Sequence, residues 1–151
     1  MNKCRIGESK FGKSLFASAA MKKGEIAFTE DGVITSVQTK YSYQVDWDKH
    51  YEPDGPSAFL NHSCLPNIGM RVKKGAKPVF YALRDIAEGE ELFIDYATFE
   101  YKTKVLANIK CLCGAPNCRG HITGFVGLSP EQVKDYSDCL ADYLKEKKPA
   151  K

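Results

Sequence analysis

The segment CLCGAPNCRG, residues 111–120, places three cysteines within eight residues and constrains the fold more than any other stretch. A glycine and a proline between the cysteines bend the chain into a tight loop, so the thiols can face one point. Zinc takes four tetrahedral ligands and binds thiolates well. The spacing therefore predicts that Cys111, Cys113 and Cys118 bind a metal ion. A disulfide loop with one spare thiol is the alternative.

A fourth metal ligand has to come from another part of the chain. Cys4 lies in an N-terminal segment without a clear pattern, and Cys139 is better explained by packing on the apolar face of a predicted helix. Cys64 and His121 are the other candidates. The spacing alone does not choose between these two residues.

The chain has 151 residues, enough for one domain with a sizeable core. Its formal net charge of +3 is too small to indicate nucleic-acid binding by itself. No apolar run approaches the roughly 18 residues of a membrane span, and residues 14–21 are too short for a secretory signal. We therefore expect an intracellular protein without a membrane or direct nucleic-acid partner. In that setting cysteines stay reduced and serve metal binding or catalysis.

Short runs of β-branched and aromatic residues recur along the chain, separated by turn signals such as KKGAKP at 73–78. The predicted strands are residues 13–17, 25–29, 32–37, 41–47, 67–72, 78–86 and 91–96. We expect a single helix over residues 129–144, because Ser129 and Gln132 form a capping box before an apolar face. The sequence thus predicts a mainly β, β-rich α+β fold with one C-terminal helix.

The segment FLNHSCLPN, residues 59–67, is unusually dense in polar chemistry. Three interpretations compete from the residues alone. Cys64 could be a nucleophile beside His62, it could belong to a metal site, or the loop could be held by its own hydrogen bonds.

Three blocks in this order resemble the SET-domain protein lysine methyltransferases that carry a post-SET zinc loop. They are FLNHSCLPN, RDIAEGEELFIDY (84–96) and the cysteine loop. The upstream segment KFGKSLFA (10–17) is similar to the cofactor loop of that family. The resemblance implies a SET domain over residues 5–98, a post-SET zinc loop over 108–122, and a C-terminal helix with a basic tail over 128–146.

The family fold is a cluster of small sheets in which the segment carrying NHSC threads under a loop as a pseudoknot, an exception to the usual absence of threading. This threading would bring NHSC beside Asp95 and Tyr96. It would also bring Cys64 to the loop cysteines, so the resemblance selects Cys64 as the fourth ligand of one structural zinc ion. The ring of His62 is then expected to be a buried, hydrogen-bonded group without chemistry of its own.

The resemblance implies that S-adenosylmethionine is the cofactor and that a lysine of a protein substrate is methylated. Tyr96 matches the catalytic tyrosine of the family. The implied cofactor-binding residues are Phe11, Gly12, Lys13, Ser14, Tyr41, Asn61, His62, Tyr96 and Leu112. Ser14 departs from the family pattern, which has a second glycine there. A non-catalytic SET module that binds proteins, and a zinc-dependent redox or cysteine enzyme, are the competing interpretations.

Overall fold

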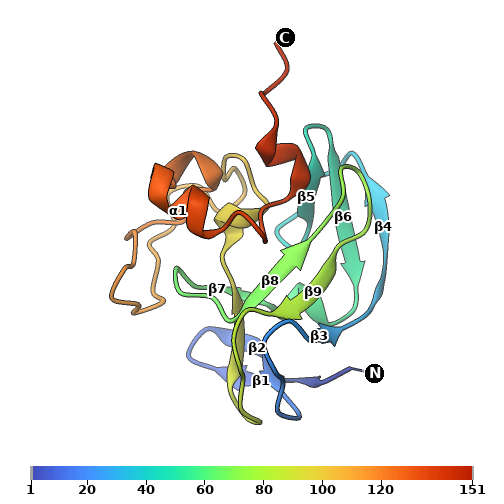
Figure 1. Ribbon diagram of the computed structural model, residues 1–151, viewed down its shortest axis with the longest axis vertical. Helices are drawn as coiled ribbons and strands as arrows, with labels where there is room; N and C mark the ends of the chain where they lie inside the picture. Colours follow the sequence, from blue (N-terminus) through green and yellow to red (C-terminus); the bar gives the residue numbers. More distant parts are fainter. Residues whose placement is uncertain (1, 151) are drawn as a thin grey trace.

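In a computed structural model that describes residues 2–150, ten short strands form three small sheets (Figure 1). The first sheet has the order β1 (Cys4–Ser9), β2 (Gly12–Ala17), β10 (Glu91–Ile94), β7 (Asn61–His62). The second has the order β3 (Ile26–Phe28), β9 (Val79–Ala82), β8 (Ile68–Arg71). The third has the order β4 (Asp31–Thr35), β6 (Lys49–Asp54), β5 (Tyr43–Asp46). The predicted β-rich fold class is confirmed.

All seven predicted strands are present with slightly different ends, and three further strands were not predicted. β1 and β6 have mainly polar and charged residues, and β7 has only two residues, so none of them shows a clear apolar alternation. β6 contains Pro53, which lacks an N–H donor and lies opposite Gly32 near the strand end. Pairing with neighbouring strands, rather than local pattern, makes these three segments extended.

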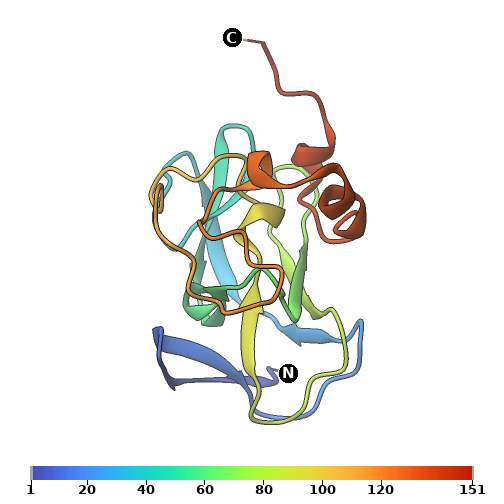
Figure 2. The same ribbon diagram turned by 90° about the vertical axis from the view of Figure 1, so that its left-hand side faces the viewer.

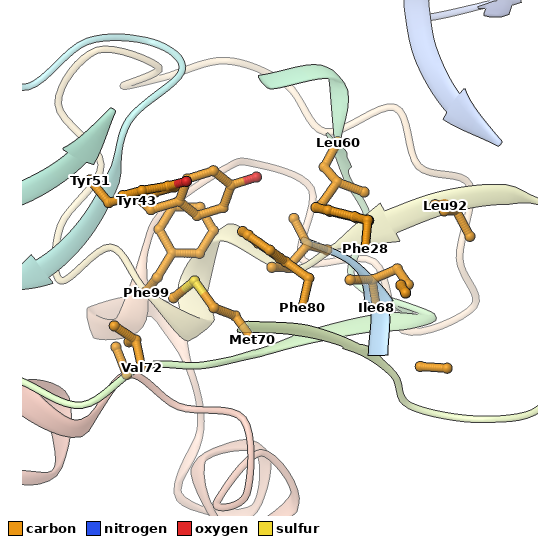
Figure 3. Close-up of a cluster of buried hydrophobic side chains, with 14 of the residues drawn as sticks. Phe28, Tyr43, Tyr51, Leu60, Ile68, Met70, Val72, Phe80, Leu92 and Phe99 are labelled. Atoms are coloured by element: carbon orange, nitrogen blue, oxygen red, sulfur yellow. The ribbon is translucent and has the colours of Figure 1, made fainter. Parts of the chain in front are cut away.

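An apolar core joins the three sheets, and aromatic side chains dominate its centre (Figure 3). The rings of Phe28 and Phe80 stack with centroids 4.9 Å apart, and those of Tyr43 and Phe99 lie 4.5 Å apart. The four side chains come from β3, β9, β5 and the segment after β10. The core therefore fixes the end of β10 relative to the other two sheets.

β7 lies parallel to β10, with Asn61 opposite Phe93 and His62 opposite Ile94. Asn67 continues the attachment through its side chain, which accepts from the Phe93 N–H at 2.8 Å and donates to the Glu91 carbonyl at 2.8 Å. The NHSC segment thus lies alongside the strand that leads into Asp95 and Tyr96. This is the adjacency that the family fold implied.

The C-terminal helix is much shorter than predicted. α1 covers only Pro130–Asp135, and the expectation of a helix through residue 144 is wrong. The capping box is present, since the Ser129 hydroxyl accepts from the Gln132 N–H and the Gln132 side chain accepts from the Ser129 N–H. After residue 136 the chain turns inward, and Leu140, Ala141 and Tyr143 are buried in the core. Burial of these side chains outweighs the local helical preference.

Short 3₁₀ helices complete the chain: η1 (Pro56–Phe59), η2 (Tyr96–Thr98), η3 (Phe125–Gly127) and η4 (Asp142–Lys145). None of the helices within residues 2–150 is long and apolar enough to cross a membrane.

Candidate functional site

The predicted metal ligands form a compact thiol cluster. The Sγ atoms of Cys64, Cys111, Cys113 and Cys118 all lie within 4.8 Å of one another, and those of Cys64 and Cys111 are 3.9 Å apart. Tetrahedral zinc with Zn–S bonds of about 2.3 Å places its sulfurs about 3.8 Å apart, so the thiol cluster fits such an ion. His121, the alternative fourth ligand, is exposed and lies outside this cluster.

Backbone amides favour the thiolate form that a metal requires. The N–H of Arg119 points at the Cys64 sulfur at 3.5 Å, and that of Gly120 at the Cys118 sulfur at 3.4 Å. Burial raises the pKa of Cys64 to about 11. Burial also acts to raise the pKa of Cys113, but the amides of Cys64 and Ala115 lower it to about 6. The loop therefore presents both charge-stabilising donors and a partly desolvated pocket for a cation.

The ring of His62 connects the thiol cluster to Tyr96. The N–H of Tyr96 donates to Nδ1 of His62 at 3.1 Å, and Nε2 lies 3.5 Å from the Cys64 sulfur. Because a backbone N–H can only donate, Nδ1 is the acceptor and Nε2 carries the proton toward sulfur. Burial lowers the pKa of His62 to about 4, so the ring is neutral near pH 7.

A large pocket of about 710 Å³ opens beside Tyr96, a volume in the range of small-molecule sites. Seven of the nine expected cofactor residues line it: Phe11, Lys13, Tyr41, Asn61, His62, Tyr96 and Leu112. Gly12 and Ser14 do not line it, although they belong to the same strand as Lys13. The metal loop forms one wall of the pocket. In Figures 1 and 2 this loop is the orange segment that passes near β7 and the yellow end of β10.

The side chain of Asn61 is oriented by the β2 segment. Its amide nitrogen donates to the Lys13 carbonyl at 3.2 Å and to the Ser14 hydroxyl at 2.6 Å. Since the Lys13 carbonyl can only accept, the nitrogen of the amide must face it, and the amide oxygen is left to accept from a ligand. Ser14 itself is fully buried, and its hydroxyl also bonds to Ser9. The buried serine that replaces the family glycine therefore helps to orient the Asn61 side chain.

Four lysines from three segments line the large pocket: Lys10, Lys13, Lys40 and Lys110. Within the described chain, none of the residues lining this pocket is acidic. The lysines therefore give the pocket a positive potential, which favours a carboxylate group on a ligand.

A second, narrower pocket is also lined by Tyr96. Its walls include the aromatic side chains of Tyr43, Tyr96 and Phe99, and it shares Tyr41 and Leu60 with the large pocket. The space open to water-sized groups is only about 20 Å³, enough for about one water molecule. Tyr43 and Phe99 were not predicted as site residues, because Tyr43 lies in a strand, where aromatic residues are usually core residues, and Phe99 lies in a segment without a clear pattern.

The hydroxyl of Tyr96 stands where the two pockets meet. It donates to the carbonyl of Leu60 at 3.0 Å, so its oxygen lone pairs stay available as acceptors. Burial raises the pKa of Tyr96, so the hydroxyl remains protonated at neutral pH.

Glu100 is a buried carboxylate in the narrow pocket, with 7% of its surface exposed. One oxygen accepts from Gln38 at 3.3 Å, and the other lies near the Thr103 hydroxyl without a hydrogen bond of good geometry. Burial raises the pKa of Glu100 above its ordinary 4.5. Charging this carboxylate therefore opposes folding once the pH exceeds 4.5, and the penalty disappears as the pH falls below that value.

We expect Glu100→Gln to raise the melting temperature by a few degrees at pH 7, because glutamine removes the charge that burial disfavours. The gain should shrink as the pH approaches 4. Thermal melts followed by circular dichroism from pH 4 to 8 measure it, with Glu88→Gln as the control at an exposed glutamate. A gain of the same size at every pH would argue against the shifted pKa.

Comparison with known proteins places these features in a family. The family model described as "SET domain" matches residues 12–97. A histone-lysine N-methyltransferase, H3 lysine-4 specific, from Debaryomyces hansenii is 38% identical over 94 residues, covering 58% of this chain and 8% of the relative. The protein of the same name from Schizosaccharomyces pombe is 51% identical over 67 residues, covering 42% of this chain and 7% of the relative. The chain thus spans less than a tenth of the length of these relatives.

Solved structures show the same fold. KRYPTONITE in complex with mCHH DNA, an H3(1–15) peptide and SAH superposes with a TM-score of 0.65 at 22% identity, covering 81% of this chain and 30% of that one. KRYPTONITE with mCHG DNA and SAH gives a TM-score of 0.63 at 23% identity, covering 79% and 28%. At these identities the likeness concerns the fold.

Proposed function

Since the chain belongs to the SET-domain family, we propose that it is an S-adenosylmethionine-dependent methyltransferase acting on lysine side chains of proteins. One observation carries the proposal. Tyr96 lines both a large pocket with room for a cofactor and a narrow aromatic pocket, which would have to widen to admit a lysine side chain. We propose the SET domain over residues 5–98 and the post-SET metal loop over 108–122.

The residues of the large pocket suit the two ends of the proposed cofactor. The Asn61 amide oxygen can accept from an ammonium group, and Lys13 can pair with a carboxylate. The backbone at His62 and the side chains of Phe11 and Leu112 offer a less polar wall for the adenine end. When bound, S-adenosylmethionine supplies an electrophilic methyl group on a positively charged sulfur.

The chain itself can prepare the lysine for transfer. A lysine amine has an ordinary pKa of about 10.4 and must lose its proton before it can act as a nucleophile. The narrow aromatic pocket desolvates the amine, and the positive sulfur of the proposed cofactor would repel its charged form. Both effects lower the pKa of the substrate lysine, whereas the Glu100 carboxylate in the same pocket acts in the opposite direction.

Tyr96 is proposed to be the catalytic residue. With its proton given to Leu60, the hydroxyl oxygen can accept a hydrogen bond from the substrate amine and orient its lone pair. Such a fixed dipole in a water-poor site stabilises a reaction more than it would in water. The proposed zinc ion, bound by the thiol cluster, holds the metal loop against the pocket and takes no part in the transfer.

The substrate is proposed to be a protein, with histone H3 as the first candidate, and the setting intracellular. The relatives named above are histone H3 lysine-4 enzymes, and KRYPTONITE was crystallised with an H3 peptide. The first test is transfer of a labelled methyl group from S-adenosylmethionine to core histones and to the H3(1–15) peptide, followed by mass spectrometry. A whole-proteome extract heated to inactivate its own enzymes serves as the second substrate.

A non-catalytic SET module is the competing function, because Ser14 replaces the family glycine in the cofactor loop. Calorimetric titration with S-adenosylmethionine accompanies the transfer assay. Cofactor binding without transfer to any substrate would favour the binding module, and transfer excludes it.

Asn61→Ala is expected to weaken S-adenosylmethionine binding by roughly 10-fold or more. The alanine removes the acceptor for the cofactor ammonium and releases the hold on Lys13 and Ser14. Isothermal titration calorimetry measures the change. Asn2→Ala is the control, because that amide also holds a backbone segment, by accepting from the Thr29 N–H, but belongs neither to the pocket nor to the metal loop. Unchanged affinity in Asn61→Ala would remove this residue from the site.

A further inference from the structure

The carboxylate of Asp95 is completely buried, directly before Tyr96 in the chain. Arg119 donates to it with both terminal nitrogens, at 2.8 and 2.7 Å. The hydroxyl of Tyr136 donates at 2.8 Å, and the N–H of Ala97 at 3.0 Å. A buried carboxylate is tolerated only with such partners, so Arg119 and Tyr136 determine where Asp95 lies.

The residues after Tyr96 are held by the same C-terminal segment that provides Tyr136. The N–H of Ala141 donates to the Thr98 carbonyl at 2.8 Å, and the hydroxyl of Tyr143 donates to the Phe99 carbonyl at 2.5 Å. Ala141 and Tyr143 are fully buried, so core packing fixes both donors. Residues 136–143 therefore hold the turn formed by residues 95–99 at both ends, at Asp95 and at the carbonyls of Thr98 and Phe99.

The family match ends at residue 97, so Arg119, Tyr136, Ala141 and Tyr143 all lie in the part of the chain beyond it. Between the two ends of the turn, Tyr96 is attached by its amide to His62 and by its hydroxyl to Leu60. The direction of the Tyr96 side chain depends on the backbone of residues 95–99. A misplacement of about 1 Å at a reacting group costs about 100-fold in rate.

We propose that residues 136–143 form a clamp that positions Tyr96 for methyl transfer, with Tyr136 and Arg119 acting through Asp95. The inference rests on the proposed methyltransferase function and assigns a role in it to the C-terminal segment. Tyr136 and Arg119 are positioning residues, since neither lines the large or the narrow pocket. Arg119 follows the proposed metal ligand Cys118, so its contact with Asp95 also attaches the metal loop to this carboxylate.

Tyr136→Phe removes one hydroxyl and keeps the ring. We expect kcat to fall about 10-fold, because Asp95 loses one of its donors and holds the backbone of residues 95–99 less precisely. KM for the cofactor should stay within a factor of two, and zinc content should not change. The matched control is Tyr81→Phe, whose hydroxyl donates to the nearby Asp138 carbonyl at 3.2 Å and has no contact with Asp95. The control should retain wild-type kcat.

Arg119→Lys keeps the charge but loses the two-pronged contact, and should lower kcat by a similar factor. If both residues act through Asp95, the double variant should lose less than the product of the single effects. Full multiplication of the two effects would mean that they act independently. A lower melting temperature with unchanged kcat in Tyr136→Phe would make the contact merely structural and overturn the proposal.

A second measurement does not depend on activity. Backbone amide exchange at Ala97, which donates to Asp95, should become about 10-fold faster in Tyr136→Phe, while exchange in β1 and β2 stays as in the wild type. Unchanged exchange at Ala97 overturns the clamp even if the enzyme proves active. Absence of methyl transfer by the wild type would refute the proposed function instead, and the exchange measurement would still decide whether the clamp holds this turn.

Discussion

Replacing Tyr96 by phenylalanine is expected to lower the rate of methyl transfer by about 100-fold or more. That is the scale observed when one preorganised polar group is removed from an active site. The substitution takes away the hydroxyl between the two pockets and leaves the ring in contact with His62 and Phe99, whose centroids lie 5.1 and 5.5 Å from its own. The fold and the zinc content should therefore survive.

Single-turnover transfer at saturating cofactor is the informative measurement, because it isolates the chemical step from product release. Tyr51→Phe is a matched control that removes another buried, hydrogen-bonded hydroxyl, from a residue that lines neither pocket. A loss confined to KM would mean that the hydroxyl contributes only uniform binding. Transfer by Tyr96→Phe within a factor of three of the wild type would show that Tyr96 is a structural tyrosine.

Cys64→Ser is expected to abolish stoichiometric zinc binding and to destabilise the metal loop. Cys64 is almost completely buried and is the one member of the thiol cluster that comes from outside the loop. Loss of an outer hydrogen-bond partner alone costs a metal site about 10–100-fold in affinity, so loss of a ligand should cost more. Because metal binding is coupled to folding, the melting temperature should fall as well.

Elemental analysis of protein purified without chelator gives the zinc content, and competition with a coloured chelator gives the affinity. Cys139→Ser is the control, since Cys139 is also buried but lies outside the thiol cluster. We expect one zinc per chain in the wild type and in the control. A zinc-free wild type would refute the metal site, and full zinc content in Cys64→Ser would exclude Cys64 as a ligand.

Loss of zinc should also weaken the hydrogen bond of the Tyr96 backbone amide. The neutral ring of His62 contacts both the Cys64 sulfur and the Tyr96 amide. Addition of a strong chelator to the wild type is therefore expected to speed amide exchange at Tyr96 as well as in the metal loop. Exchange that changes only in the loop would show that His62 does not transmit the loss.

Local patterns predicted those features that depend on residues near one another in the chain. The spacing of Cys111, Cys113 and Cys118 indicated a metal loop, and Ser129 with Gln132 indicated where α1 begins. The end of α1 could not be predicted in this way. Local propensity favours a helix through residue 144, whereas core packing pulls residues 140–144 out of it. Tertiary burial is stronger than the few tenths of a kcal/mol that propensity contributes per residue.

The sequence by itself determined the chemistry of the candidate site. The spacing indicated the loop thiols, and the resemblance to one family implied the roles of Asn61, His62 and Tyr96 and selected Cys64 from two open choices. The tertiary structure decided how these groups are connected. Ser14 orients Asn61, His62 joins Cys64 to Tyr96, and Arg119 and Tyr136 converge on Asp95. Most of these contacts join residues tens of positions apart. Sheet pairing and core packing bring such residues together, and no spacing within the sequence records that arrangement.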